Sequence, residues 1–470
     1  MYIEQLYTGC LSEAAYYIES KGEVAIIDPL RDIEEYTALA KERNAVIKYI
    51  FETHFHADFV SGHIDLSKAT GAPIIYGPGT QTAFPVYVAK DGETFKLGKL
   101  IIEVLHTPGH TLESCCYLLK DENNKDYAVF TGDTLFVGDV GRPDLSQKED
   151  TLTTHDLAGI MYDSLHKKII PLNDDVIVYP AHGAGSSCGK NLGSNTSSRI
   201  GDEKQTNYAL RAQSKEEFIA AVTEGLSSPP QYFPVNAKIN KEGYESLGSI
   251  LETALKPLSI TEVKSLINNG NIILLDTRPE EEFTDGFIPG SIFIGLNGRY
   301  AEWAGSLLPF DKTIIVIAEE GKEKESIVRL TRVGFSKFAG YVGGGFHAWK
   351  NAGEETDMII NIEPDELAMD IPHDDKLVVV DVRRETEFAD GHVKDAVNIP
   401  LNSLTDPASM ANIEDDQNLY VHCAGGYRSV IAASLLKRQG IHNLYNVLGG
   451  WNKIKQQAKI KTEKETSILN

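Results

Sequence analysis

The sequence predicts an α/β protein made of more than one domain. Short apolar runs alternate with helical patterns along its 470 residues, and a prior of about 150 residues per domain suggests roughly three domains. In the N-terminal part, several apolar runs end in His or Asp. In the C-terminal part, one pattern occurs twice at a constant offset of 105 residues.

Composition and charge exclude several classes of function. A hydrophobic content of 42% fits an ordinary globular protein, and the net charge of -23 argues against a nucleic-acid surface. No apolar run approaches the length of a membrane span, and the first residues lack the pattern of a signal peptide. Five scattered cysteines without a CxxC motif are typical of reduced thiols. We therefore expect a cytoplasmic protein without nucleic-acid or membrane partners.

Five segments of the N-terminal part deliver a His or Asp directly after an apolar run. Buried strands that end in polar groups at one sheet edge are how an α/β enzyme gathers a site from distant parts of the sequence. A single His at a strand end is more often structural, but a convergent set of His and carboxylate groups is what transition metals require. The segments are "EVAIID" to Asp28, "VIKYIFETH" to His54, "LIIEVLHTPGH" to His110, "YAVFTGD" to Asp133 and "DVIVYPAH" to His182.

The motifs "THFHAD", "TPGHT", "TGD" and "PAHG", in this order, resemble the metallo-β-lactamase superfamily over roughly residues 1–205. The resemblance implies an αββα sandwich. In the two-metal members, residues matching His54, His56 and His110 hold one ion. Residues matching Asp58, Phe59 and His182 hold the other, and the residue matching Asp133 bridges them. Phe59 cannot bind a metal, so the second site has lost a ligand.

One branch resembles this chain in particular, because "HxHADF", "TPGHT", "TGD" and "GRxD" are similar to the persulfide dioxygenases. The resemblance implies a single Fe(II) per chain, held by His54, His110 and Asp133. Two histidines and one carboxylate leave coordination positions open for O2 and a substrate sulfur, whereas zinc would give a Lewis acid without redox chemistry. We interpret Phe59 as the mark of a one-metal oxygenase.

Further polar residues are expected around this metal or at the substrate. Arg142 would suit an anionic persulfide or a carboxylate-bearing carrier, although a salt bridge explains a single Arg equally well. Cys188 follows His182 closely and is expected near the metal, although a loop cysteine is more often inert. The expected set is Asp28, His56, Asp58, Arg142, His182 and Cys188.

The second C-terminal copy carries a candidate nucleophile. In "LYVHCAGGYRS", an apolar run precedes Cys423, and a glycine-bearing loop then leads into a helix whose N-terminus favours a sulfur anion. Residues 360–460, with "VVDVR", "CAGGYRS" and "LGGW", resemble a rhodanese domain. The resemblance implies that Cys423 carries a persulfide and that Arg428 is its anion partner. The remaining loop residues are Ala424, Gly425, Gly426, Tyr427 and Ser429.

The first C-terminal copy, residues 257–355, lacks this chemistry. Ala318 stands where the second copy has Cys423, and Glu323 stands where it has Arg428. We expect a rhodanese-like domain without sulfurtransferase activity that serves as a spacer or an interface. Residues 206–256, which include "SSPPQYFP", are expected to form a connecting segment that packs on its neighbours.

Together these features predict a fused persulfide dioxygenase and sulfurtransferase that acts in sulfide detoxification. The metal domain would oxidise a low-molecular-weight thiol persulfide to sulfite with O2. Cys423 would transfer sulfur between persulfide, sulfite and thiosulfate. One alternative is a two-zinc thiolester hydrolase of the glyoxalase II type, and another is a non-catalytic sulfur carrier with a structural metal. We also expect a homo-oligomer.

Overall fold

The computed structural model describes residues 1–145, 152–190, 192–226, 228–268, 270–410, 413–414 and 416–465. The chain divides into two compact units. The first unit comprises Met1–Gly248 with Leu330–Ser336, and the second comprises Ser249–Arg329 with Lys337–Asn470. The predicted domain limits lie at other positions and stay predictions. Among the described residues, no helix is both long and apolar enough to cross a membrane.

The described part of the first unit contains two six-stranded sheets, in the strand orders β1-β2-β3-β4-β5-β6 and β12-β11-β10-β9-β8-β7. The strands of the first sheet are β1 (Tyr2–Thr8), β2 (Glu13–Ser20), β3 (Glu23–Ile27), β4 (Val46–Phe51), β5 (Ile74–Tyr76) and β6 (Tyr87–Val88). Those of the second are β7 (Thr94–Leu97), β8 (Leu100–His106), β9 (Cys115–Lys120), β10 (Asp126–Gly132), β11 (Ile177–Pro180) and β12 (Ser198–Arg199).

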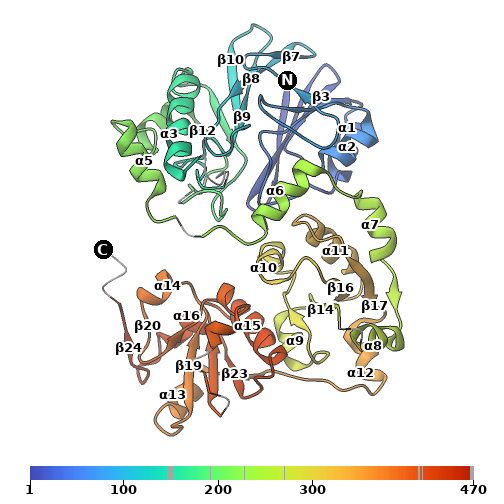
Figure 1. The fold of residues 1–470 in the computed structure, drawn as a ribbon, viewed down its shortest axis with the longest axis vertical. Helices are drawn as coiled ribbons and strands as arrows, with labels where there is room; N and C mark the ends of the chain where they lie inside the picture. Colours follow the sequence, from blue (N-terminus) through green and yellow to red (C-terminus); the bar gives the residue numbers. More distant parts are fainter. Residues whose placement is uncertain are drawn as a thin grey trace. The chain divides into compact units, whose positions relative to one another are not determined.

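Helices α1 (Glu34–Glu42) and α2 (His63–Thr70) cover the outer face of the first sheet, and α3 (Thr154–Ser164) and α5 (Lys215–Thr223) cover that of the second (Figure 1). The unit also contains α4 (Ile200–Thr206), α6 (Phe233–Glu242) and a π-helix at Leu165–Ile169. The alternation along the strands explains the layers. Tyr16 and Ile18 point into the core between the sheets, whereas Tyr17 between them packs toward α1. The expected αββα sandwich is thereby confirmed.

The described part of the second unit contains two five-stranded parallel sheets of the same strand order. After α7 (Leu247–Ala254), the first copy has β13 (Pro257–Leu258), α8 (Ile260–Asn268), β14 (Ile272–Asp276), α9 (Glu280–Asp285), β15 (Ile292–Phe293), α10 (Tyr300–Leu307), β16 (Thr313–Ile317), α11 (Glu323–Thr331), β17 (Phe338–Val342) and α12 (Gly345–Asn351).

The second copy has β18 (Ile360–Ile362), α13 (Pro364–Asp370), β19 (Leu377–Asp381), α14 (Glu385–Ala389), β20 (His392–Val393), β21 (Val397–Asn398), 3₁₀ turns at Leu401–Ser403 and Pro407–Met410, β22 (Asn418–His422), α15 (Tyr427–Arg438), β23 (Leu444–Val447), α16 (Gly450–Ile454) and β24 (Thr462–Glu463). The main difference between the copies lies at α10 of the first copy, because the second copy has two short 3₁₀ turns at the corresponding place.

A buried ion pair follows β14 and recurs after β19. Arg278 binds Asp276 and donates to the carbonyl of Gly286 at 2.9 Å. At the predicted offset of 105 residues, Arg383 binds Asp381 in the same way and donates to the carbonyl of Gly391 at 2.7 Å. The internal repeat predicted from the sequence is therefore a repeat of structure, and each copy is an α/β domain as expected.

Candidate functional sites

The polar residues predicted at strand ends gather at one edge of the sandwich. Asp28 follows β3 and His54 follows β4, and these strands are parallel neighbours. Asp133 follows β10 and His182 follows β11, which are also parallel neighbours. Carboxyl ends of adjacent parallel strands meet at the same edge, so the topology itself assembles the cluster.

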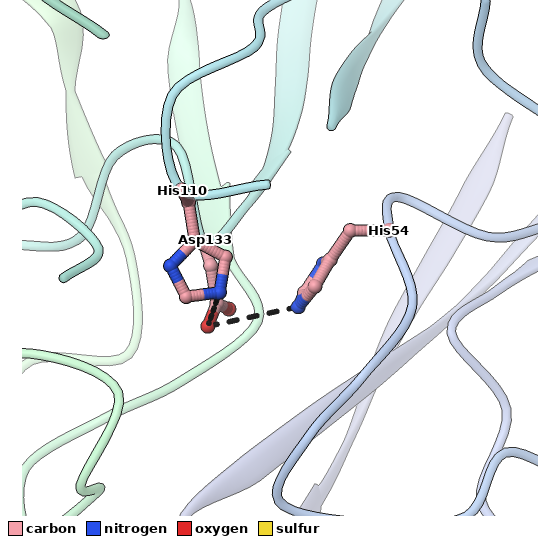
Figure 2. Close-up of side chains that lie close together, drawn as sticks. All are labelled: His54, His110 and Asp133. Atoms are coloured by element: carbon pink, nitrogen blue, oxygen red, sulfur yellow. Dashed lines mark ion pairs between the residues drawn. The ribbon is translucent and has the colours of Figure 1, made fainter. Parts of the chain in front are cut away.

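Three of these side chains converge on one point. The Nε2 atom of His54 lies 3.8 Å from Oδ2 of Asp133, and the Nε2 atom of His110 lies 3.3 Å from the same oxygen. Figure 2 shows both imidazoles directed at this carboxylate. All three residues are about 1% exposed. The arrangement is two histidines and one carboxylate around a common position.

The hydrogen bonds on the far side of each ring fix its tautomer. Nδ1 of His110 lies 2.8 Å from the carbonyl oxygen of Arg142, which can only accept, so Nδ1 carries the proton. Nδ1 of His54 lies 2.9 Å from the hydroxyl of Thr53, and that hydroxyl donates its own proton to Asp28 at 2.8 Å. In the neutral form of each ring, the lone pair is then on Nε2, the atom that faces Asp133.

A cation is needed to make this arrangement favourable. Nε2 of His54 and both carboxylate oxygens of Asp133 are buried and have no hydrogen-bond partner among the described residues. Burial, with the neighbouring histidines, lowers the pKa of His54 well below its usual range, which keeps it neutral as a ligand must be. His54, His110 and Asp133 offer ligand atoms within 4.8 Å of one another. The residues fit a bound metal ion.

His56, a ligand in the two-metal pattern, is engaged elsewhere. Its Nε2 lies 3.0 Å from Asp28 and 3.6 Å from Glu52. Burial opposes its charged form, but the carboxylates of Asp28, Glu52 and Asp58 outweigh it and raise the pKa of His56 to about 10. These two contacts suit His56 to an internal ion pair with Asp28 and Glu52. Glu52 was not among the residues predicted from the sequence.

A second group lies on the other side of Asp133. Nε2 of His182 is 3.4 Å from Oδ1 of Asp133 and 3.4 Å from Oδ2 of Asp58, and the thiol of Cys188 lies within 4.8 Å of the His182 and Asp58 ligand atoms. Phe59 is fully buried and packs on His56, with ring centroids 4.3 Å apart. Burial, with Asp58 and Asp133, raises the pKa of Cys188 well above its usual range and favours the neutral thiol. Cys188 thus lies beside the cluster, as expected.

Arg142 binds an anion of its own chain. Its guanidinium makes a bidentate pair with Asp144, at 2.7 and 2.8 Å, and donates to the carbonyl of Ser187 at 3.2 Å. Its backbone N–H donates to the carbonyl of Cys188 at 2.9 Å, while its carbonyl orients His110. This geometry favours the salt-bridge interpretation of Arg142 over binding of a substrate anion.

The connecting segment takes part in the site, which the sequence did not reveal. Asn240 on α6 donates to the carbonyls of His56 and Phe59, each at 2.8 Å, and accepts from the N–H of Ser61 at 2.9 Å. The same helix lines a cavity of about 680 Å³ that contains His110 and is bordered by Lys238 and Lys241. Helix α6 therefore holds the ligand loop and brings Lys238, Lys241 and Glu242 to the cavity that contains His110.

The second site is the loop at Cys423, which follows β22. The N–H of Gly426 donates to Sγ of Cys423 at 3.1 Å, and helix α15 begins directly after this glycine. Gly450 packs so closely that a Cβ there would lie 2.3 Å from the carbonyl oxygen of Cys423. The N–H of Gly426 and the N-terminus of α15 thus lie at Cys423, a residue that is only 2% exposed.

Neighbouring side chains hold this loop in shape. Ser429 donates to the carbonyl of Gly426 at 2.6 Å, and Arg428 forms a bidentate pair with Glu387 at 2.7 and 2.8 Å. Arg428 holds the pKa of Glu387 below its ordinary value. Ala424 is tied down through its carbonyl, which accepts from Asn452 at 3.0 Å. The predicted loop residues are therefore together, with Arg428 bound to an internal carboxylate.

The corresponding loop of the first copy keeps the backbone and lacks the thiol. Ala318 follows β16 and is 6% exposed, and α11 begins at Glu323. Gly345 packs on the carbonyl of Ala318 as Gly450 packs on that of Cys423. The fold of the loop is retained without its nucleophile.

Comparisons with known proteins agree with this architecture. The family model of the metallo-beta-lactamase superfamily matches residues 8–182, and that of the rhodanese-like domain matches residues 259–352 and 363–457. A crystal structure of a metallo-beta-lactamase from Staphylococcus aureus is 32% identical, with a TM-score of 0.64. The match covers 73% of this chain and 98% of that one, so it extends beyond the first domain.

Curated relatives resemble the N-terminal part. A probable hydroxyacylglutathione hydrolase of Schizosaccharomyces pombe is 36% identical, over 34% of this chain and 58% of the relative. A hydroxyacylglutathione hydrolase of Haemophilus influenzae is 28% identical, over 42% of this chain and 91% of the relative. The chain spans between 58% and 66% of the length of the first three such relatives.

Proposed function

The chain belongs to the metallo-β-lactamase superfamily and continues into two rhodanese-like domains, and from this we propose that it combines two activities on sulfur. The first unit acts as a persulfide dioxygenase with one Fe(II), and Cys423 acts as a sulfurtransferase. The overall oxidation is R–S–SH + O2 + H2O to R–SH, sulfite and two protons. Such a pair of activities serves to remove sulfide-derived sulfur.

One observation carries the oxygenase proposal. Two imidazoles and one carboxylate face a common point, while His56 is held by Asp28 and a phenyl ring stands at position 59. A two-histidine, one-carboxylate set is typical of mononuclear iron oxygenases. Fe(II) held by His54, His110 and Asp133 would supply redox chemistry and open coordination positions.

The chain's own residues prepare the substrate. Lys238 and Lys241 line the cavity beside His110 together with Glu113, Asp144 and Glu242. The two lysines are the groups that would meet a persulfide anion or a carboxylate-bearing carrier. Its volume of about 680 Å³ holds an organic thiol rather than an inorganic ion alone. Phe55 and Phe233 add apolar walls that exclude water from part of the cavity.

At the second site, the Cys423 thiolate attacks the outer sulfur of a persulfide. The donor S–S bond breaks, the thiolate R–S⁻ leaves with the electron pair, and a persulfide forms on Cys423. Transfer of that sulfur to sulfite gives thiosulfate and restores the thiolate, without net oxidation. The N–H of Gly426 and the start of α15 stabilise the anionic sulfur.

A specific observation favours a second candidate, a two-metal thiolester hydrolase. Asp58, His182 and Cys188 form a further ligand group beside Asp133, and curated relatives are named hydroxyacylglutathione hydrolases. One feature argues against this candidate. Phe59 stands at the position where the two-metal enzymes have a metal-binding histidine, and a hydrolytic pair of ions needs that ligand.

Parallel assays on one preparation decide between the two. Wild-type protein should consume O2 with glutathione persulfide and should not hydrolyse S-lactoylglutathione. His110→Ala should lose bound metal and O2 uptake together, whereas His166→Ala should keep both, because His166 lies in the outer helical layer and contacts Tyr162. Thiolester hydrolysis without O2 uptake would establish the hydrolase instead.

A further inference from the structure

The cavity at Cys423 is built by both C-terminal copies. It has a volume of about 880 Å³, within the range of about 300–1,000 Å³ that holds drug-sized organic molecules. Cys423 and Arg428 contribute one side. The other side consists of residues of the copy that lacks a nucleophile, among them Glu280, Arg299 and Trp303. A tetrahedral ion such as thiosulfate would leave most of this space empty.

Several contacts hold the first copy against the catalytic loop, so the side of the cavity that it forms is a fixed part of the structure. The hydroxyl of Tyr427, a loop residue, donates to the carbonyl of Gly295 at 2.6 Å. A Cβ on Gly298 would lie 2.4 Å from the Tyr427 ring, so only glycine allows this approach. The N–H of Phe293 donates to the hydroxyl of Ser434 on α15 at 3.0 Å. These contacts hold α10 at the mouth of the sulfur site.

The charges of the cavity are mixed. Arg299 and Arg384 bring positive charge, and Glu280 and Glu281 bring negative charge. Burial, with Glu281 nearby, raises the pKa of Glu280. A carboxylate ligand would favour the arginines and an ammonium group would favour the glutamates. Trp303 adds a flat apolar surface between them.

We propose that the copy without a nucleophile is the carrier-binding half of the sulfurtransferase site, and that it recognises the α-amino-acid group of a cysteinyl thiol persulfide. Arg299 binds the carboxylate, Glu281 binds the ammonium, and the sulfane sulfur points at Cys423. The inference rests on the proposed sulfur transfer at Cys423. The transfer forms the Cys423 S–S bond and releases the cysteinyl thiolate with its electron pair.

The test compares donors that differ by a single charged group. Full-length protein is assayed anaerobically, so that O2 chemistry does not consume the donor, with cyanide as sulfur acceptor. The donors are the persulfides of cysteine, cysteamine (without the carboxylate) and 3-mercaptopropionate (without the ammonium). In wild-type protein, kcat/KM should be highest for cysteine persulfide, by about tenfold for each missing charge.

Each variant should remove the preference for one charged group of the donor. Arg299→Ala should lower the ratio of kcat/KM for cysteine persulfide over cysteamine persulfide by about tenfold, and Glu281→Gln should do the same relative to the 3-mercaptopropionate persulfide. Arg211→Ala removes an exposed Arg of the first unit and should leave both ratios as in wild type.

Failure of the inference and failure of the proposed function give different results. Unchanged ratios in Arg299→Ala and Glu281→Gln, with normal circular dichroism and Cys423-dependent transfer, would overturn carrier recognition alone. Because Arg299 pairs with Glu302, Arg299→Lys serves as a second variant that retains the charge and should retain most of the preference. Sulfur transfer that persists in Cys423→Ser would instead overturn the proposed sulfurtransferase.

Discussion

Removal of the Asn240 amide should loosen the ligand loop of the metal site. Asn240 is fully buried, and its side chain satisfies the carbonyls of His56 and Phe59 and the N–H of Ser61. Asn240→Ala leaves these three groups buried without partners. Each unsatisfied group costs about 1–3 kcal/mol, and a water entering the vacated space recovers part of this, so we expect a loss of about 3–5 kcal/mol.

The same helix offers a matched control. Asn236 lies one turn earlier on α6, is equally buried, and its side-chain atoms make no hydrogen bond with the described residues. Asn236→Ala should therefore change stability by less than about 1 kcal/mol. Asn240→Asp keeps the acceptor for Ser61 but sets a carboxylate against two carbonyls, so it should resemble Asn240→Ala.

Hydrogen exchange measures this effect where it acts. The amide of Ser61 donates to Asn240, so peptides covering residues 54–61 should exchange about 100-fold faster or more in Asn240→Ala and at the wild-type rate in Asn236→Ala. Metal affinity should fall in parallel, because the loop carries His54. Equal exchange in both variants would refute this role of Asn240 and show that α6 packs on the loop without holding it.

Three further predictions concern the C-terminal copies. Cys423→Ser should abolish sulfur transfer and leave persulfide-dependent O2 uptake intact, with free sulfite accumulating; loss of O2 uptake at normal metal content would contradict separate sites. Ala318→Cys in that background should not restore transfer, since Glu319 and its neighbours disfavour an anionic sulfur, and appreciable turnover would contradict this. Arg428 lowers the pKa of Glu387 in the folded protein. Their ion pair therefore stabilises the fold fully above the unfolded pKa of about 4.3, and this stabilisation is lost as the pH falls through the lower folded pKa. Glu387→Gln should remove this acid dependence from urea unfolding, and an unchanged pH profile would contradict it.

Strand periodicity and motif order were enough to predict the sheet edge that holds the metal cluster and the repeat of the C-terminal domain. Apolar runs ending in His54 and Asp133 implied convergence at one sheet edge, and parallel pairing of the strands produces it. The constant offset between Ala318 and Cys423 predicted two copies of one fold. Both features can be recognised in the sequence itself, so they can be found without knowledge of tertiary contacts.

The remainder depends on packing between distant segments. Asn240 lies 184 positions after the His56 carbonyl that it binds, and a buried amide on a helix has no distinguishing spacing. The sequence left Arg142 open between a substrate anion and a salt bridge, and the bidentate pair with Asp144 favours the salt bridge. The carrier-binding wall of the Cys423 cavity arises only when the two copies dock through Tyr427.

The most direct test of the central claim is metal analysis and O2 uptake on the same anaerobically purified protein. One iron held by His54, His110 and Asp133 predicts one iron per chain, and one O2 consumed for each persulfide converted to sulfite. Uptake should scale with iron content as the metal is removed and restored. Two zinc ions per chain, with no O2 uptake from any persulfide, would contradict the proposed oxygenase.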